Sequence, residues 1–242
     1  MLLEIIATSA DEAVTAASYG ADRVELISAF EQGGLSPQED VTLTTIEALK
    51  RFEQSDNAPI SKIIPIHAMV RPHSKSFVYD KADLSVMITE LKNLHRLGVH
   101  AFVLGTLRSN GTIDTEALER LLDAAGDRPV TFHRAFDEVH DQEAALTTLL
   151  EYPQIKWVLT SGGKPSVLQA VNQISRLIEL SKGQTITIMP GSGLSVASLP
   201  DFVQATGAQA VHLGTGVRYG GTDTPIDGAL VQQARQLLDQ FS

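Results

Sequence analysis

Short apolar runs alternate with amphipathic segments along the whole chain. Eight runs rich in aliphatic and β-branched residues are expected to be strands, over residues 2–8, 23–27, 63–70, 101–105, 130–136, 156–161, 185–190 and 210–214. The segments between these runs have the apolar spacing of helices, and several open with residues that favour a helix start. These start signals are Ser9, Ser36 with Pro37, Asp114, and Pro165 with Ser166. Strict alternation of strand and helix predicts a parallel sheet.

Two α/β architectures use such units, the (β/α)₈ TIM-type barrel and the doubly wound sheet. A dinucleotide-binding doubly wound sheet carries a glycine-rich turn after its first strand, but residues 7–10 read ATSA. The glycine-rich turns follow the last three expected strands instead, and 242 residues is a usual barrel length. No linker or low-complexity tract divides the chain. We therefore expect one TIM-type barrel domain over residues 1–242.

Polar residues occur at positions that should point into this barrel. Successive strand residues face opposite sides, so the apolar face of each run packs on helices and the other face turns inward. Residues 64, 66, 68 and 70 are all apolar, for example, which turns His67 and Arg71 inward. The full inward set is Glu4, Glu25, His67, Met69, Arg71, Thr131, His133, Thr160, Met189 and His212, with Asp137 just beyond its strand. Because barrel interiors are usually aliphatic, this set indicates a hydrogen-bonded polar core or a ligand site.

Four of these residues are candidates for acid–base catalysis: His133, Asp137, Glu25 and His67. An imidazole changes protonation near neutral pH, and a carboxylate can orient it or exchange a proton itself. Arg134 follows His133 directly, so alternation along the strand places it on the opposite side, where it can pair with a helix or loop carboxylate.

Three adjacent turns at the expected barrel mouth are typical of phosphate or other anion sites, because backbone N–H groups at small residues can approach an anion closely. Each turn alone is also ordinary loop chemistry. The candidate anion-binding residues are Arg71, Arg134, Ser161, Gly162, Gly191, Gly193 and Gly214.

The same inward groups can instead hold a metal ion. The candidate ligands are His67, His133, His212 and Glu4, with Glu25 as a further carboxylate, a nitrogen and oxygen set suited to zinc, copper(II) or iron. Their spacing matches no compact metal motif.

Net charge and the absence of cysteine limit the kinds of partner and site that this protein can have. A formal net charge of −10 argues against nucleic acid and acidic membranes, and the absence of cysteine excludes disulfides and thiolate metal sites. Residues 1–8 lack the features of a signal peptide, and no apolar stretch is long enough to span a bilayer, so a cytoplasmic protein is expected. Helix-face contacts between barrels also favour a homo-oligomer.

Several segments together make the chain resemble the CutC copper-homeostasis family. They are GADRVEL at 20–26, GGLSP at 33–37, Arg71 with Pro72, TFHRAFD at 131–137, LTSG at 159–162 and GSG at 191–193. The resemblance implies a cytosolic TIM-type barrel associated with copper homeostasis and with copper binding. It also implies cysteines near the first two strands and after the third, where this chain has Ile6, Ala7, Ile27 and Val78.

Two functions follow from these observations. The resemblance implies a copper-homeostasis protein that binds copper. Because the chain has no cysteine, Cu⁺ would have only methionines and histidines as ligands, and Met69 and Met189 are the inward methionine candidates. The polar interior and the glycine-rich turns also suit an enzyme acting on a small phosphorylated or anionic metabolite by His and carboxylate acid–base chemistry.

Overall fold

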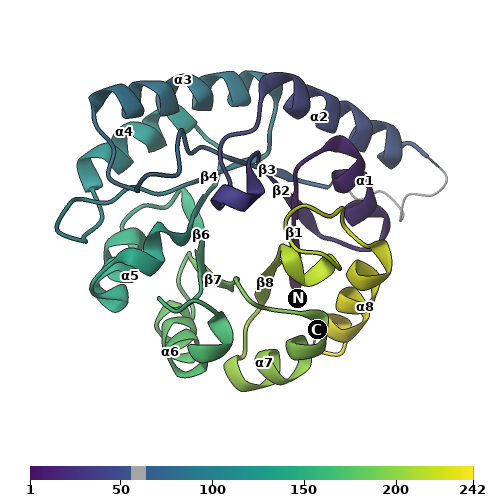
Figure 1. Ribbon diagram of the computed structural model, residues 1–242. Coiled ribbons are helices and arrows are strands. Elements are labelled where there is room, and N and C mark those ends of the chain that lie inside the picture. Colours follow the sequence, from purple (N-terminus) through teal and green to yellow (C-terminus); the bar gives the residue numbers. More distant parts are fainter. Residues whose placement is uncertain (56–63, 242) are drawn as a thin grey trace.

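Eight parallel strands form the centre of the molecule and eight helices surround them in the part of the chain that the structure describes (Figure 1). This computed structural model describes residues 1–55 and 64–241. The strands are β1 Leu2–Ala7, β2 Arg23–Leu26, β3 Ile66–Met69, β4 Ala101–Leu104, β5 Val130–Phe132, β6 Ile155–Thr160, β7 Thr187–Pro190 and β8 Ala210–Leu213. The helices are α1 Ala10–Ser18, α2 Glu39–Glu53, α3 Lys81–Leu97, α4 Thr115–Ala125, α5 Gln142–Leu150, α6 Val171–Ser181, α7 Leu199–Thr206 and α8 Gly228–Asp239.

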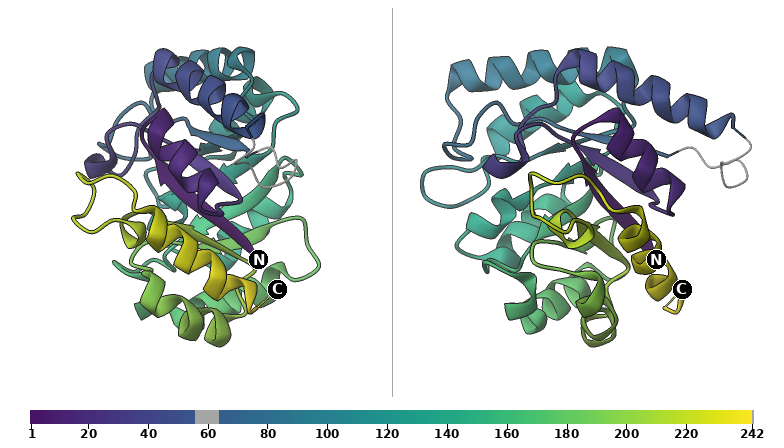
Figure 2. Two further views of the ribbon diagram at one scale, coloured as in Figure 1. Left: turned by 90° about the vertical axis from the view of Figure 1, so that its right-hand side faces the viewer. Right: turned by 45° about the vertical axis from the view of Figure 1, so that its right-hand side comes forward.

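The order of the strands confirms the TIM-type barrel. Hydrogen-bonded neighbours run β7-β6-β5-β4-β3-β2-β1-β8, so β1 pairs with both β2 and β8 and the sheet curls into a nearly closed barrel. A doubly wound sheet would reverse its strand order part-way, which this one does not. Both termini lie together at one end of the barrel (Figure 2), where Arg235 Nη1 donates to the Met1 carbonyl at 3.1 Å.

Two of the predicted start signals cap helices directly. Ser9 accepts the Glu12 N–H at the start of α1, and Asp114 accepts the Ala117 N–H at the start of α4. Ser166 instead caps a single 3₁₀ turn, Val167–Gln169, and α6 begins only at Val171. These caps satisfy N–H groups that a helix start leaves without intrahelical partners.

Most predicted strands were too long, and 63–70 and 130–136 by the widest margin. Residue 63 of the predicted strand 63–70 lies outside the described residues, and β3 occupies Ile66–Met69. The predicted strand 130–136 ends at Phe132, because the His133 Nδ1 accepts the Ala135 N–H and the chain turns into a 3₁₀ helix over Arg134–Glu138. Inward and outward alternation therefore stops at His133, and Asp137 reaches its place by a turn.

The apolar face of each strand packs against helices as predicted. Leu3, Ile5, Val24 and Leu26 are buried in the main core cluster with residues of the helices. The prediction that Thr160 points inward was wrong. Thr160 has the same parity as Val158 and faces outward, where its hydroxyl donates to Asp137 Oδ1 at 2.5 Å. Across residues 1–55 and 64–241, no helix has the length and apolarity that a bilayer crossing needs.

Candidate functional site

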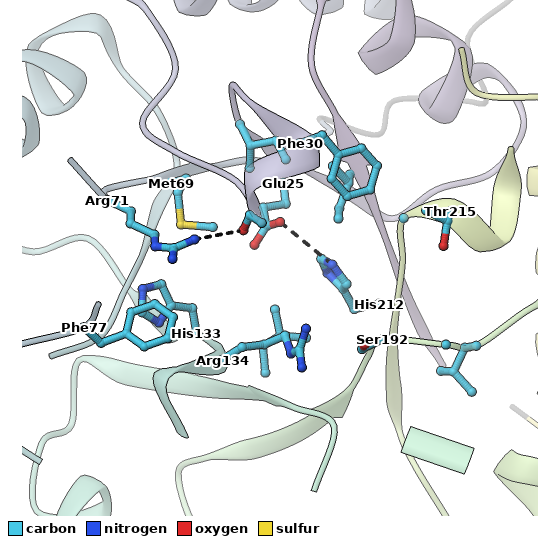
Figure 3. A pocket seen from close by; sticks show the side chains of 17 residues that line it. Glu25, Phe30, Met69, Arg71, Phe77, His133, Arg134, Ser192, His212 and Thr215 are labelled. Carbon is cyan, nitrogen blue, oxygen red and sulfur yellow. Dashed lines mark hydrogen bonds and ion pairs between the residues drawn. The ribbon is translucent and has the colours of Figure 1, made fainter. Parts of the chain in front are cut away.

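A pocket of about 210 Å³ opens where the strands end, the end at which barrel enzymes carry their sites. Side chains from five strand ends and the loops after them converge on it (Figure 3). Its polar lining comes from Glu25, Arg71, His133, Arg134, Ser192, His212 and Thr215, and its apolar lining from Ile6, Ile27, Phe30, Met69, Phe77, Leu159 and Leu194.

Glu4 lies beneath the pocket and interacts with two buried side chains, Arg23 and His212. Its carboxylate accepts from Arg23 Nε at 2.6 Å and from His212 Nδ1 at 2.7 Å, and it is fully buried. Burial favours the neutral acid, but the Arg23 charge and the His212 hydrogen bond outweigh it, so the pKa of Glu4 lies well below its usual range. Glu4 is therefore a permanent anion that fixes the His212 ring.

Glu25 and His212 connect these buried charged groups to the pocket, which both side chains line (Figure 3). The His212 Nε2 lies 3.8 Å from Glu25 Oε2. Burial raises the pKa of Glu25 to about 7, and the His212 charge opposes that rise. Burial also favours neutral His212, but Glu25 and Glu4 outweigh it and raise the His212 pKa. Glu25 can therefore exchange a proton near neutral pH, with the His212 ring beside it.

His133 is the neutral imidazole of the pocket. Burial and then the charge of Arg71 lower the pKa of His133 to about 3. Its Nδ1 accepts the Ala135 N–H at 3.2 Å, so the single proton of the neutral ring is on Nε2. Gly105 makes room for the ring, since a Cβ there would lie 2.6 Å from the Nδ1 atom.

His67 lies outside the pocket lining. Burial and the Arg23 charge lower the pKa of His67 to about 3, and its ring packs 5.0 Å from that of Trp157. Arg23 was missed by the sequence reasoning, although it shares the inward parity of Glu25. Its guanidinium stacks 4.0 Å from the Trp157 ring centroid, so Trp157 and His67 support the Arg23–Glu4 pair.

Asp137 does not line the pocket. Its carboxylate accepts from Arg134 Nε at 2.8 Å, from the Ser161 N–H at 2.9 Å and from the Gly163 N–H at 3.2 Å. The Gly162 N–H donates to the Thr160 hydroxyl. The turn after β6 thus binds the carboxylate of Asp137. The N–H groups of Ser161 and Gly162 are therefore not free to bind an anionic ligand.

Arg134 lines the pocket, so the prediction that it lies on the side opposite His133 was wrong. Because the 3₁₀ turn starts directly after His133, both side chains line the pocket rather than opposite faces (Figure 3). Gly193 and Gly214 line it as well, whereas the Gly191 N–H donates to the Thr160 carbonyl at 3.0 Å. Of the predicted anion-binding residues, the structure gathers Arg71, Arg134, Gly193 and Gly214 around the pocket.

Replacing Asp137 by alanine is expected to lower the free energy of unfolding by about 2–4 kcal/mol, because the buried Ser161 N–H, the buried Thr160 hydroxyl and Arg134 would lose their acceptor. Urea denaturation measures the loss. Asp127→Ala is the control: the Asp127 side chain is 87% exposed beside Arg128, and a change within about 0.5 kcal/mol is expected. Equal effects of the two variants would show that Asp137 does not hold the turn.

The site has two chemical capacities. Within the described residues, the side chains whose ligand atoms all lie within 4.8 Å of one another are Glu4, Glu25 and His212, so these can surround a metal ion. The predicted set that included His67 and His133 is not gathered in this way. Without a metal, Glu25 and His212 form a proton-exchanging pair at the pocket floor.

Comparison with known proteins shows the family of this chain. The model of the CutC family matches residues 1–217. The chain belongs to the CutC family. The human relative, named copper homeostasis protein cutC homolog, is 37% identical over 211 residues, which are 87% of this chain and 72% of the human one. The CutC family protein of Klebsiella pneumoniae strain 342 is 34% identical over 215 residues, 89% of this chain and 80% of its own.

Solved structures show the same architecture. CutC from Streptococcus agalactiae superposes with a TM-score of 0.79 at 29% identity, covering 89% of this chain and 98% of its own. Phosphoribosylanthranilate isomerase from Pyrococcus furiosus has a TM-score of 0.58 at 13% identity over 99% of both chains, and shares only the fold. In this CutC chain, Ile6 and Ile27 line the pocket at two of the neighbourhoods where the family resemblance implies cysteine.

Proposed function

We propose that this chain acts in copper homeostasis, from the cytoplasm, and that its barrel pocket binds copper as Cu²⁺ through His212 and Glu25. Membership of the CutC family and the names of its human and mouse relatives support the first part. The observation that carries the second is the Glu4–His212–Glu25 cluster.

The donor types suit Cu²⁺ better than Cu⁺. Cu⁺ prefers soft sulfur, and the chain has no cysteine, whereas imidazole nitrogen and carboxylate oxygen suit Cu²⁺. Met69 is the thioether that lines the pocket. We therefore expect any Cu⁺ affinity to be much weaker than that of a thiolate site.

The second layer of the cluster also suits a metal. Metal-binding histidines usually donate their other ring N–H to a carboxylate, which fixes the ring and raises its basicity. His212 does so from Nδ1 to Glu4 at 2.7 Å, which leaves Nε2 for the ion and Glu25 Oε2 at 3.8 Å as its neighbour. The pocket provides space for the further ligands that two protein donors leave open.

His212→Gln and Glu25→Gln are each expected to weaken Cu²⁺ binding by on the order of 100-fold, because each removes a direct ligand. CuSO₄ is titrated into EDTA-treated, dialysed protein against a chromogenic chelator, and the electron paramagnetic resonance spectrum of the bound ion should show coupling to an imidazole nitrogen. An anaerobic Cu⁺ titration runs in parallel.

His140→Gln is the matched control, since it removes an exposed imidazole outside the pocket lining and should bind Cu²⁺ as the wild type does. Circular dichroism establishes that each variant is folded. The copper site is refuted when the wild type takes up no Cu²⁺ at equimolar concentration, or when both cluster variants bind it unchanged.

A further inference from the structure

One buried arginine beside the pocket lacks a counter-ion. Three arginines are buried in the described residues, and Arg23 pairs with Glu4 while Arg218 pairs with Glu12. Arg71, 8% exposed, has no carboxylate within ion-pair distance among residues 1–55 and 64–241. Buried charges are costly unless paired, so the Arg71 charge requires explanation.

Carbonyl groups hold the Arg71 side chain without neutralising it. Its Nη1 donates to the carbonyls of Gln32, Gly33 and Gly34 at 3.4, 3.3 and 3.1 Å. Its guanidinium lies 4.7 Å from the Phe77 ring centroid, and the ring of His133 also packs against Phe77, at 4.7 Å between centroids. The cation is therefore fixed in place at the pocket wall, facing Glu25 across the pocket (Figure 3).

Three pocket side chains also have buried polar atoms that no partner satisfies in the described part of the chain. They are Arg71 Nε, His133 Nε2 and Glu25 Oε1, and the buried Tyr79 hydroxyl lies near the Arg71 guanidinium. Two of these are N–H donors on one side of the pocket, and buried donors without acceptors are rare in folded proteins. A ligand with acceptor oxygens would match both the charge and the donors.

We propose that the pocket binds a small organic oxyanion, whose charged group pairs with Arg71 beside His133 and whose uncharged end faces Glu25 and His212. The guanidinium fork suits carboxylate and phosphate alike. The size of the pocket limits the ligand: a cavity of about 150 Å³ accommodates benzene, and this one measures about 210 Å³. A three-carbon acid or phosphate monoester is of the right size, and the apolar walls of Ile27, Phe30 and Leu194 would contact its carbon chain.

The experiment uses EDTA-treated full-length protein and isothermal titration with two probes, glycerol 3-phosphate and lactate, which distinguish phosphate from carboxylate. One probe molecule per chain is expected to bind, and Arg71→Met is expected to weaken binding at least about tenfold, because it removes a charge-assisted contact. In ¹⁵N-edited spectra, the His133 Nε2 resonance should shift when the probe is added.

Arg176→Met is the control, since Arg176 pairs with Glu143 on the surface and its side chain is 56% exposed. If Arg71→Met fails to fold, His133→Phe replaces it. We expect His133→Phe to weaken probe binding less than about tenfold, and Arg176→Met to leave probe binding unchanged. Absence of binding of both probes at millimolar concentration overturns the proposal, as does unchanged binding by the folded pocket variant.

The anion site and the copper site can fail separately. Arg71→Met should leave Cu²⁺ binding within about threefold of wild type, because Arg71 is not a copper ligand, and His212→Gln should leave the probe contact with Arg71 intact. Loss of both ligands in both variants would mean that the pocket has collapsed, and would contradict the separate contacts proposed here.

Discussion

Replacing Glu4 by glutamine is expected to lower the free energy of unfolding by about 3–5 kcal/mol, the usual loss when one partner of a buried ion pair is removed. The neutral amide would leave the Arg23 guanidinium, 2% exposed, without its counter-ion. It would also weaken the hydrogen bond that His212 Nδ1 donates at 2.7 Å. The pKa of Glu4 is lowered on folding, so the loss should be complete above the ordinary pKa of 4.5 and should shrink as the pH falls below it.

Urea denaturation followed by circular dichroism measures this loss. Glu39→Gln is the matched control, because Glu39 also pairs with an arginine, Arg96 at 2.9 Å, but both side chains are more than half exposed. Exposed pairs contribute little, so a change of less than about 0.5 kcal/mol is expected for the control. A Glu4→Gln protein as stable as the control would contradict the central place given to this carboxylate.

Replacing Glu25 by glutamine should change how stability depends on pH. The folded pKa of Glu25, about 7, lies above its ordinary value of 4.5, so the folded state binds the proton more tightly than the unfolded state. This contribution to stability is complete below the unfolded pKa and is lost as the pH rises through the folded pKa. Wild-type stability should therefore fall by about 2–4 kcal/mol relative to Glu25→Gln between about pH 5 and pH 8.

The groups that face Glu25 determine how this result is judged. They are Glu4, Arg23, His67, His212 and Arg71. Of these, His212 also has a raised pKa and would add a fall in the same direction, but it remains in the Glu25→Gln variant. Because Glu25 itself raises the His212 pKa, the difference between the two unfolding curves at each pH reports Glu25 together with the part of the His212 shift that Glu25 causes. Parallel curves across the range would show that the carboxyl is ionised as an ordinary surface glutamate is.

Much of the candidate site was predictable from local pattern. Glu4, Glu25, His67, His133 and His212 were placed inside the barrel because the opposite face of each strand is apolar and packs on helices, and the structure buries each of them. Arg23 has the same parity and was missed, because an arginine at the first residue of a strand is no signal of a site until its partner Glu4 is known. Prediction failed where alternation stopped: after Phe132 the chain turns, so Arg134 enters the pocket and Asp137 binds the turn after β6.

The sequence by itself determined the barrel, its strand order and the polar character of its interior, because strand and helix periodicity are local properties and parallel βα units close in few ways. Only the tertiary structure decided which polar groups meet. Glu4 lies opposite both Arg23 and His212 through strand register, and 208 residues separate Glu4 from His212 along the chain. It also showed that Asp137 has the turn after β6 as its partner while Arg71 has no carboxylate partner in the described residues. Charge pairing depends on distances between elements, which register and loop paths set and which no local pattern contains.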